Sequence, residues 1–285
     1  MNRVRYALVV AAWLAVGPVL AASAEPVGTW TARQPIVGST GETIHYYLFT
    51  PGKVDPARKY PLVVWLHGGL KSNGKGGPNM PTGAFYSPEH QGKQACFVLR
   101  PVAIKGKNWV SPRGAGAGSH KMPAKPAGSM VVLLELLEKI VAKNPIDTAS
   151  MHVVGASMGG YGVWDLISRC PKKFASAIPI CGGGDPTKAE SIKHVRIWIF
   201  HSADDRIVPV RGSRDMFAAL MKAKDEKPVV KDDERKTVSA SADGRIRYTE
   251  YKSGGHNAWD RAMREPELLG WVFPRGKSAG GARPS

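Results

Sequence analysis

Five short, almost wholly apolar segments lie between residues 61 and 203, and they restrict the possible folds more than any other feature of the chain. They cover residues 61–67, 95–103, 151–157, 174–182 and 195–203. Apolar runs of this length, bounded by Pro and Gly, are typical of strands covered on both faces of a sheet. Segments with helical periodicity lie between or after them, over residues 129–143, 158–169, 213–223 and 261–271. This alternation predicts an α/β fold with a mostly parallel central sheet flanked by helices.

The first predicted helix has the clearest apolar face. That face carries Met130, Leu133, Leu134, Leu137, Ile140 and Val141. Ser129 is placed to cap the start of the helix, and Asn144 followed by Pro145 is expected to end it.

Three other stretches depart from the strand and helix pattern. Residues 26–50 alternate apolar and polar side chains around Gly turns, which predicts an antiparallel hairpin at one edge of the sheet. Residues 113–128 are rich in Gly, Ala and Pro and are expected to form a loop, which could close over a site. Residues 222–245 form a charged insertion.

The N-terminus has the layout of a secretory signal peptide. Arg3 and Arg5 precede an apolar stretch over residues 7–20, and small residues end at Ala24. The apolar stretch is shorter than the roughly 20 residues that span a bilayer, so we expect export and no stable membrane anchor. The prediction is a signal peptide over 1–24, one domain over 25–273, a disordered tail over 274–285, and a periplasmic or secreted protein.

The charge of the chain bears on its partners. It has 40 Lys and Arg against 23 Asp and Glu, a formal net charge of +17. Acidic side chains are interspersed with the basic ones in "KAKDEKPVVKDDERK", and no nucleic-acid motif accompanies them. We therefore expect a solvated basic surface and no nucleic-acid partner. Attraction to an anionic glycan stays open, and with it the alternative of a non-catalytic binding module.

The chain has three cysteines, an odd number that is also too small for a disulfide framework. Cys96, Cys170 and Cys181 are scattered, and we interpret them as small core residues. No metal site, required disulfide or cofactor is predicted.

The sequence "GASMGG" at residues 155–160 follows an apolar run and precedes a predicted helix. G-x-S-x-G in this context is the nucleophile-elbow pattern, in which the glycines permit a tight turn and the serine hydroxyl projects above the sheet. Ser157 is therefore the candidate nucleophile. The helix that follows would offer the backbone N–H of Met158 to a developing oxyanion.

A serine nucleophile needs a base and an orienting acid, which follow it in the order Ser, acid, His in this pattern. Asp204 and Asp205 come directly after the predicted strand at 195–203, and both are candidates for the acid. His256 lies in a Gly-rich loop after the apolar segment "RYTEY". Both positions are expected at the carboxyl ends of strands, where open α/β sheets place their sites.

The segment "HGGL" at residues 67–70 follows the first apolar run, and Gly69 or Leu70 could donate a second N–H to the oxyanion. The same region contains Gly69, Gly74 and Lys75 at the spacing of a phosphate-binding loop. However, Gly76 occupies the position that should be Ser or Thr, and no helix is expected to follow, so we discount nucleotide binding.

The chain resembles a known group of α/β hydrolases, the predicted peptidases and phospholipase/carboxylesterase-like proteins, which are relatives of dienelactone hydrolases and of feruloyl and acetyl-xylan esterases. The resemblance rests on "KYPLVVWLHGG", "GASMGGYGVWDLISRCPKKFASAIPICGGGD", "IWIFHSADDRIVPV" and "YTEYKSGGHNAWD", and it spans residues 58–272. It implies the α/β-hydrolase fold, with Ser157 as nucleophile, Asp205 as acid and His256 as base. The family motif H-G-x-x-D-x-x-V-P is what selects Asp205 over Asp204.

Two residues depart from the pattern of that group. Leu70 stands where the group usually has a small residue, and Ser202 replaces the Gly after His201.

These features favour an exported serine hydrolase that cleaves carboxylic esters, either small molecules or esters linked to polysaccharide. A serine peptidase of the same fold is the alternative, because both reactions use an acyl-enzyme. The aromatic residues Trp109, Tyr161 and Trp164 could line the substrate pocket, although core packing is an equally good interpretation. The acyl group, the alcohol and the oligomeric state do not follow from the sequence.

Overall fold

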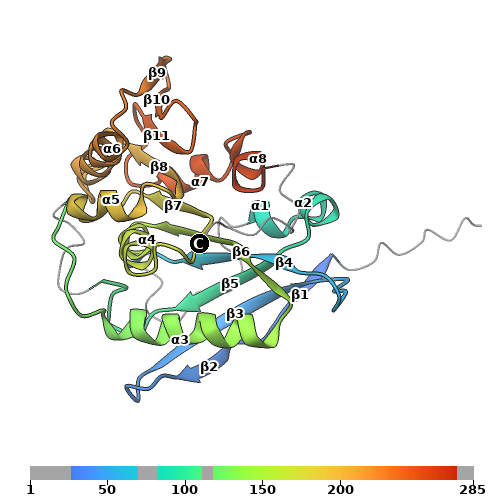
Figure 1. Ribbon diagram of the computed structural model, residues 1–285. Helices are drawn as coiled ribbons and strands as arrows, with labels where there is room; N and C mark the ends of the chain where they lie inside the picture. Colours follow the sequence, from blue (N-terminus) through green and yellow to red (C-terminus); the bar gives the residue numbers. More distant parts are fainter. Residues whose placement is uncertain (1–26, 70–82, 111–117, 275–285) are drawn as a thin grey trace, which may run out of the picture.

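The computed structural model describes residues 27–69, 83–110 and 118–274, and its centre is an eleven-stranded mixed sheet (Figure 1). The strands are β1 (Gly28–Trp30), β2 (Gln34–Val37), β3 (Thr43–Pro51), β4 (Tyr60–Leu66), β5 (Phe97–Val102), β6 (Ile146–Ala156), β7 (Ser176–Ile180), β8 (Arg196–Ser202), β9 (Val229–Asp232), β10 (Lys236–Ala240) and β11 (Ile246–Tyr251). Their order is β1-β3-β5-β4-β6-β7-β8-β11-β10-β9, with β2 also paired to β3. The strands from β5 to β11 in this order are all parallel, which confirms the predicted mostly parallel sheet.

Helices cover both faces of the sheet (Figure 1). They are α1 (Gly83–Tyr86), α2 (Pro88–Lys93), α3 (Gly128–Lys143), α4 (Met158–Arg169), the 3-10 helix η2 (Pro186–Lys188), α5 (Ala189–Ile192), α6 (Arg211–Lys224), α7 (Ala258–Ala262) and α8 (Leu268–Val272). Residues of α3, α4, α5 and α6 share one hydrophobic cluster, and residues of α1, α7 and α8 share the other.

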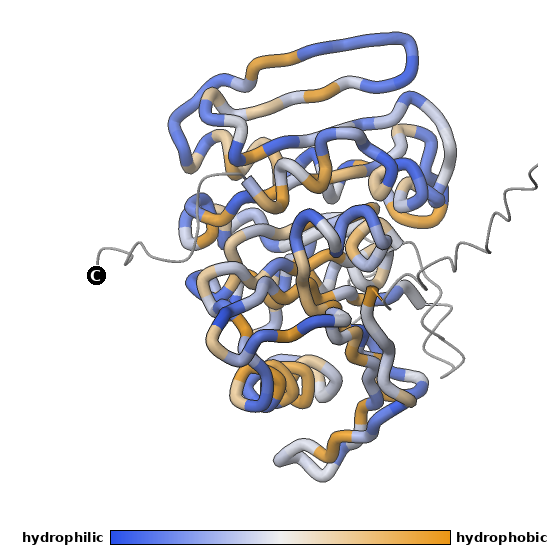
Figure 2. Tube along the Cα trace, turned by 90° about the vertical axis from the view of Figure 1, so that its right-hand side faces the viewer, coloured by the Kyte–Doolittle hydropathy of each residue, from blue (hydrophilic) through white to orange (hydrophobic). Residues whose placement is uncertain are grey.

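Strand β4 explains why the central strands are apolar without alternation. Leu62, Val64 and Leu66 belong to the cluster on one face, and Val63 and Trp65 belong to the cluster on the other. Both faces are therefore buried, as parallel sheets with helices on each side require. Figure 2 shows the hydrophobic residues concentrated in the interior, whereas the β9–β10 end is mostly hydrophilic.

The N-terminal and C-terminal edges of the sheet are both antiparallel. As predicted for residues 26–50, β1 and β2 each pair antiparallel with β3, and β3 pairs antiparallel with β5. At the other edge, the charged insertion forms β9 and β10, which extend the sheet beyond β11. These two strands were not predicted, because neither has a buried face: β9 is exposed along its length and β10 is only partly buried.

Two helix predictions need correction. Ser129 does not cap α3, whose N-cap is Ala127; the Ser129 side chain is buried and its Oγ accepts the Ile104 N–H at 3.1 Å. The helix expected over 261–271 is instead divided into α7 and α8. Pro266 lies between them, and proline lacks the N–H that a continuous helix needs and disfavours helical backbone in the residue before it.

Part of the predicted loop at 113–128 lies within the described residues, and this part is tied to the helical layer. Arg169 of α4 donates to the carbonyl oxygens of Pro123 and Ala124, at 2.8 and 3.3 Å. Asp185 accepts the Met122 N–H at 2.8 Å. The side chains of Arg169 and Asp185 therefore hold this part of the loop. Residues 111–117 fall outside the described residues.

The predicted signal peptide over 1–24 and most of the predicted tail also lie outside the residues that the structure describes. Among the described helices, none has the length and apolar character needed to cross a membrane.

The buried face of α3 provides a test of the fold. Leu137→Ala removes a fully buried side chain, so we expect the free energy of unfolding to fall by about 2 to 5 kcal/mol. Leu134, which the sequence also placed on the apolar face, is only partly buried in the structure, so Leu134→Ala should cost about 1 kcal/mol. Urea unfolding of the two variants measures the difference. Equal losses would contradict the assignment of the α3 core face.

Candidate functional site

Ser157 lies at the sharp turn between β6 and α4. Its backbone has φ 57° and ψ −120°, a conformation that residues other than glycine rarely adopt. The Ser157 N–H donates to the Ile180 carbonyl at 2.9 Å, and the Ser157 carbonyl accepts the Tyr161 N–H at 3.1 Å. These bonds hold the strained residue between β7 and the first turn of α4.

The glycines around Ser157 are required by close backbone contacts. A Cβ atom on Gly159 would lie 1.9 Å from the carbonyl oxygen of Leu66, and one on Gly155 would lie 2.4 Å from the carbonyl oxygen of Gly159. The first turn of α4 therefore lies against the end of β4, and a larger residue at either position would push the helix away. This contact is the physical reason for the G-x-S-x-G pattern.

His256 is hydrogen-bonded to Ser157 on one side and to Asp205 on the other. Its Nε2 is 2.9 Å from Ser157 Oγ, and its Nδ1 is 2.7 Å from Asp205 Oδ2. The three residues come from the loops after β6, β8 and β11, whose carboxyl ends meet at one edge of the sheet. The structure thus brings together the three residues that the sequence predicted as nucleophile, acid and base.

The Asp205 carboxylate is buried and accepts four hydrogen bonds. Oδ2 faces the imidazoles of His256 and His201, at 2.7 and 3.2 Å. Oδ1 accepts the backbone N–H groups of Ile207 and Val208, at 2.8 and 3.0 Å. Burial acts to raise the pKa of Asp205, but these hydrogen bonds outweigh it and hold the pKa well below its ordinary value. Asp205 is therefore ionised at neutral pH, beside His256.

Asp204, the other candidate for the acid, has a different set of partners. Its carboxylate accepts the N–H groups of Gly255 and Gly254, at 2.8 and 3.1 Å. Arg261 donates to the Ser253 carbonyl in the same loop. Asp204 and Arg261 therefore hold the loop that carries His256, a role that the sequence analysis did not identify.

The "HGG" segment lies beside Ser157, as expected. A Cβ atom on Gly68 would be 3.4 Å from the Cβ of Ser157. The Ala103 N–H donates to His67 Nε2 at 3.0 Å, so the ring proton is on Nδ1, which donates to the Gly68 carbonyl at 2.8 Å. Gly69 is exposed next to this peptide, and Leu70 lies outside the described residues.

The three aromatic residues suggested for the substrate pocket are instead buried in the core. Trp109, Tyr161 and Trp164 are each no more than 1% exposed and belong to the hydrophobic cluster of α3 to α6. Trp109 Nε1 donates to the His67 carbonyl at 3.0 Å, so it supports the "HGG" segment from behind. Core packing is therefore the correct interpretation, because their apolar surface is used between α4 and the sheet.

All three cysteines are free thiols, and Cys96 and Cys181 are buried. Cys181 lies beneath the site, and its Sγ is within 4.8 Å of potential ligand atoms of Asp205 and His256. A metal ion would need the Cys181 thiolate, but burial raises the pKa of this thiol well above its ordinary value. The carboxylate and imidazole are already hydrogen-bonded to each other. These residues do not fit a metal site.

Solved structures of similar fold include esterases and acylaminoacyl peptidases. A thermostable esterase is 32% identical with a TM-score of 0.70; the match covers 85% of this chain and 62% of that one, so this chain spans less than two thirds of its length. The acetyl xylan esterase from Aspergillus awamori is 13% identical with a TM-score of 0.61, and the match covers 85% of this chain and all of that one. A ferulic acid esterase is 14% identical with a TM-score of 0.57, over 86% and 97% of the two chains.

The sequence comparison is consistent with these structural likenesses. No curated protein matches the chain significantly. Residues 38–265 match the model of the Esterase family, which is described as "Putative esterase", and this match covers most of the chain. The chain therefore belongs to the Esterase family and has the α/β-hydrolase fold.

Proposed function

We propose that the chain is an exported serine esterase in which Ser157, His256 and Asp205 form the catalytic triad and esters linked to polysaccharide are the substrates. The hydrogen-bonded series from Ser157 Oγ to His256 to Asp205 is the observation that carries the triad. Export rests on the signal-peptide layout of the first 24 residues. The polysaccharide link rests on the acetyl xylan esterase and ferulic acid esterase likenesses and on the residue beside His256 described below.

The mechanism follows from the geometry of the three side chains. His256 Nε2 takes the proton of Ser157 as Oγ attacks the ester carbonyl, and Asp205 stabilises the imidazolium that forms. His256 then gives the proton to the departing alcohol, leaving Ser157 acylated. Water, deprotonated by His256, attacks the acyl-enzyme and releases the carboxylic acid.

The oxyanion that forms during both steps needs backbone N–H donors. We assign one to Met158, the first residue of α4, because the first N–H groups of a helix have no acceptor within the helix. The second comes from Gly69 or Leu70. His67 fixes the Gly68 carbonyl, and in the planar trans peptide the Gly69 N–H then points away from His67. His67 and Trp109 together therefore hold the Gly69 N–H in a fixed orientation.

Trp259 lies beside His256 and is the aromatic residue that we assign to the alcohol part of the substrate. Its ring is 5.5 Å from the His256 ring and nearly perpendicular to it, and it is only partly buried. The alcohol must depart next to His256 Nε2, because that atom supplies its proton. A partly exposed indole at this position can pack against the apolar face of a sugar ring.

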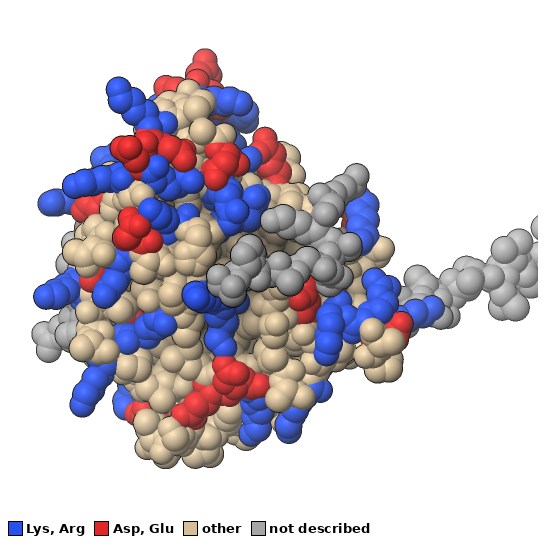
Figure 3. Space-filling view, in the orientation of Figure 1, with Lys and Arg blue, Asp and Glu red and all other residues tan. Residues whose placement is uncertain are grey.

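The basic surface supports the non-catalytic alternative poorly. Figure 3 shows Lys and Arg scattered over the visible face, with Asp and Glu among them, rather than collected in one patch. Several charges of the described residues are paired, including Arg214 with Glu250 and Lys236 with Glu265. A distributed charge of this kind attracts anionic material without defining a binding site.

The nucleophile can be tested directly. Ser157→Ala should abolish turnover of p-nitrophenyl acetate and labelling by a fluorophosphonate, because both require the Ser157 hydroxyl. The measurement is burst and steady-state kinetics with gel-based labelling on the mature chain, with thermal unfolding as the control for folding. Folded wild-type protein that takes no label would instead support a binding module.

The two adjacent acids should differ in their effect on turnover. Asp205→Asn removes the charge beside His256 and disturbs its tautomer, so kcat should fall by about 10⁴-fold. Asp204→Asn keeps side-chain oxygen for the loop and should lower kcat by about tenfold or less. Steady-state kinetics of both variants provides the comparison. The assignment of the acid is wrong if Asp204→Asn has the larger effect.

The substrate class can be tested with Trp259. The wild-type kcat/KM for acetylated xylan should exceed that for p-nitrophenyl acetate, and Trp259→Ala should raise the KM for the polymer by about threefold to tenfold. Its KM for the small ester should stay near the wild-type value. Trp30→Ala, which removes a partly buried aromatic residue from β1, is the matched control. Equal rates on both wild-type substrates, or a higher rate on a peptide, would argue against a polysaccharide ester.

A further inference from the structure

His201 is a second histidine in contact with Asp205, and the proposed mechanism does not use it. It lies near the end of β8 and is completely buried. Its Nε2 is 3.2 Å from Asp205 Oδ2 and 3.1 Å from the Val208 carbonyl oxygen. Its Nδ1 is 2.8 Å from the hydroxyl of Ser213 in α6.

The partners of His201 determine where its proton lies. Nε2 faces a carboxylate oxygen and a carbonyl oxygen, and both can only accept, so Nε2 carries a hydrogen. Nδ1 faces the Ser213 hydroxyl, which can donate or accept and is also 3.1 Å from the Gly182 carbonyl. Groups from the loop after β8, from α6 and from the segment after β7 therefore fix the ring on both edges.

His201 and His256 donate to the same oxygen of Asp205. An N–H that donates to a carboxylate stabilises its charge and lowers its basicity. The His201 N–H therefore weakens the attraction of Oδ2 for the His256 imidazolium. The Ile207 and Val208 N–H groups hold only the other oxygen, so they do not compete with His256 directly.

We propose that His201 is a positioning residue that holds the Asp205 carboxylate toward His256 and sets how strongly that carboxylate stabilises the imidazolium during ester hydrolysis. The proposal rests on the proposed roles of Ser157, His256 and Asp205. It predicts that the loss of the His201 N–H makes His256 easier to protonate.

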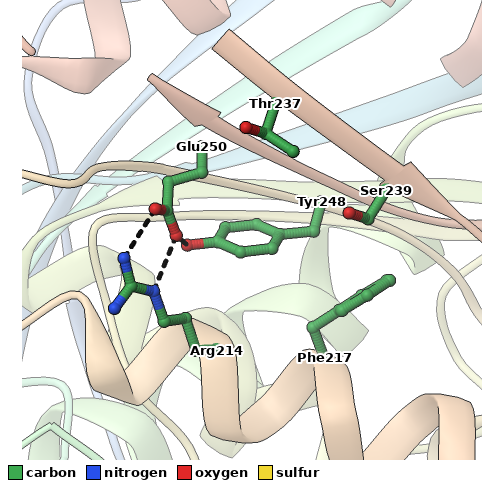
Figure 4. Close-up of a pocket in the computed structure, with 6 residues that line it drawn as sticks. All are labelled: Arg214, Phe217, Thr237, Ser239, Tyr248 and Glu250. Atoms are coloured by element: carbon green, nitrogen blue, oxygen red, sulfur yellow. Dashed lines mark hydrogen bonds and ion pairs between the residues drawn. The ribbon is translucent and has the colours of Figure 1, made fainter. Parts of the chain in front are cut away.

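Other charged and titratable groups surround this pair of histidines. Glu250 of β11 is opposite His201 in the parallel register and is paired with Arg214 of α6; in the surface cavity of Figure 4, Arg214 and Tyr248 are both directed at it. On the His256 side lie Asp204, the Cys181 thiol at the end of β7, and Arg261 of α7, which acts electrostatically on Asp204. All of these groups are the same in the wild type and in a variant substituted at His201.

The test is the pH dependence of kcat/KM for p-nitrophenyl acetate. His201→Leu removes the donor and keeps an apolar side chain in the buried site, and we expect the acidic limb to move up by about one pH unit. His201→Gln can place an amide N–H near the position of Nε2, so its acidic limb should match the wild type. His152→Leu is the control, because His152 is also a buried histidine, but it lies on β6 and its ring contacts two serine hydroxyls and not Asp205.

The outcomes separate this proposal from the proposed function. An acidic limb in His201→Leu that stays in place or moves down would overturn the role of His201, as would the same upward shift in His152→Leu. If His201→Leu does not fold, Ser213→Ala serves instead, because it frees the Nδ1 edge of the ring and should move the limb in the same direction. If the Ser157→Ala variant is as active as the wild type, the triad itself is refuted, whatever the pH profiles of the His201 variants show.

Discussion

The contact between the first turn of α4 and the end of β4 determines the geometry on which the rest of the site depends. Gly159 lies against the Leu66 carbonyl with no room for a side chain, so the helix begins immediately above the sheet. Ser157 must then turn through a strained conformation, which raises its hydroxyl above the strand ends. The same contact places the Gly68 backbone beside Ser157. One close approach of two backbone segments therefore positions both the Ser157 hydroxyl and the candidate oxyanion donors.

Burial separates the roles of two adjacent carboxylates. The Asp205 side chain is inaccessible to solvent and accepts hydrogen bonds from two imidazoles and two backbone N–H groups. Asp204 is exposed, and its carboxylate accepts hydrogen bonds from backbone N–H groups of the His256 loop. Asp205 can therefore stabilise a developing charge on His256, since interactions are stronger away from water. Asp204 acts on the same histidine through its loop. Sequence order alone allowed either residue to be the acid, and the resemblance to a family was needed to choose.

The sequence predicts those parts of the fold that have a single physical explanation. The central strands are apolar because both of their faces are buried, and this pattern was sufficient to locate β4 to β8. Strands β9 and β10 escaped prediction because β9 is exposed and β10 is only partly buried, so neither strand needs an apolar face. The last helix was predicted as one because its apolar residues continue past Pro266. The role of Ser129 was missed because its hydroxyl accepts a hydrogen bond from the Ile104 N–H, which is distant in sequence.

The same distinction applies to the site. Ser157, Asp205 and His256 are recognisable because each follows a strand in a fixed chain order, but His67, Asp204 and His201 act by orienting a neighbour, which leaves no periodic signal. The aromatic residues illustrate the point from the other side. Trp164 lies within α4 and Trp109 lies far before it in the sequence, yet both are buried in the core, and Trp109 supports the "HGG" segment through its bond to the His67 carbonyl. A site that depends on preorganised donors requires such rigid support. Apolar residues close to the site can therefore serve to hold its backbone in place and need not contact the substrate.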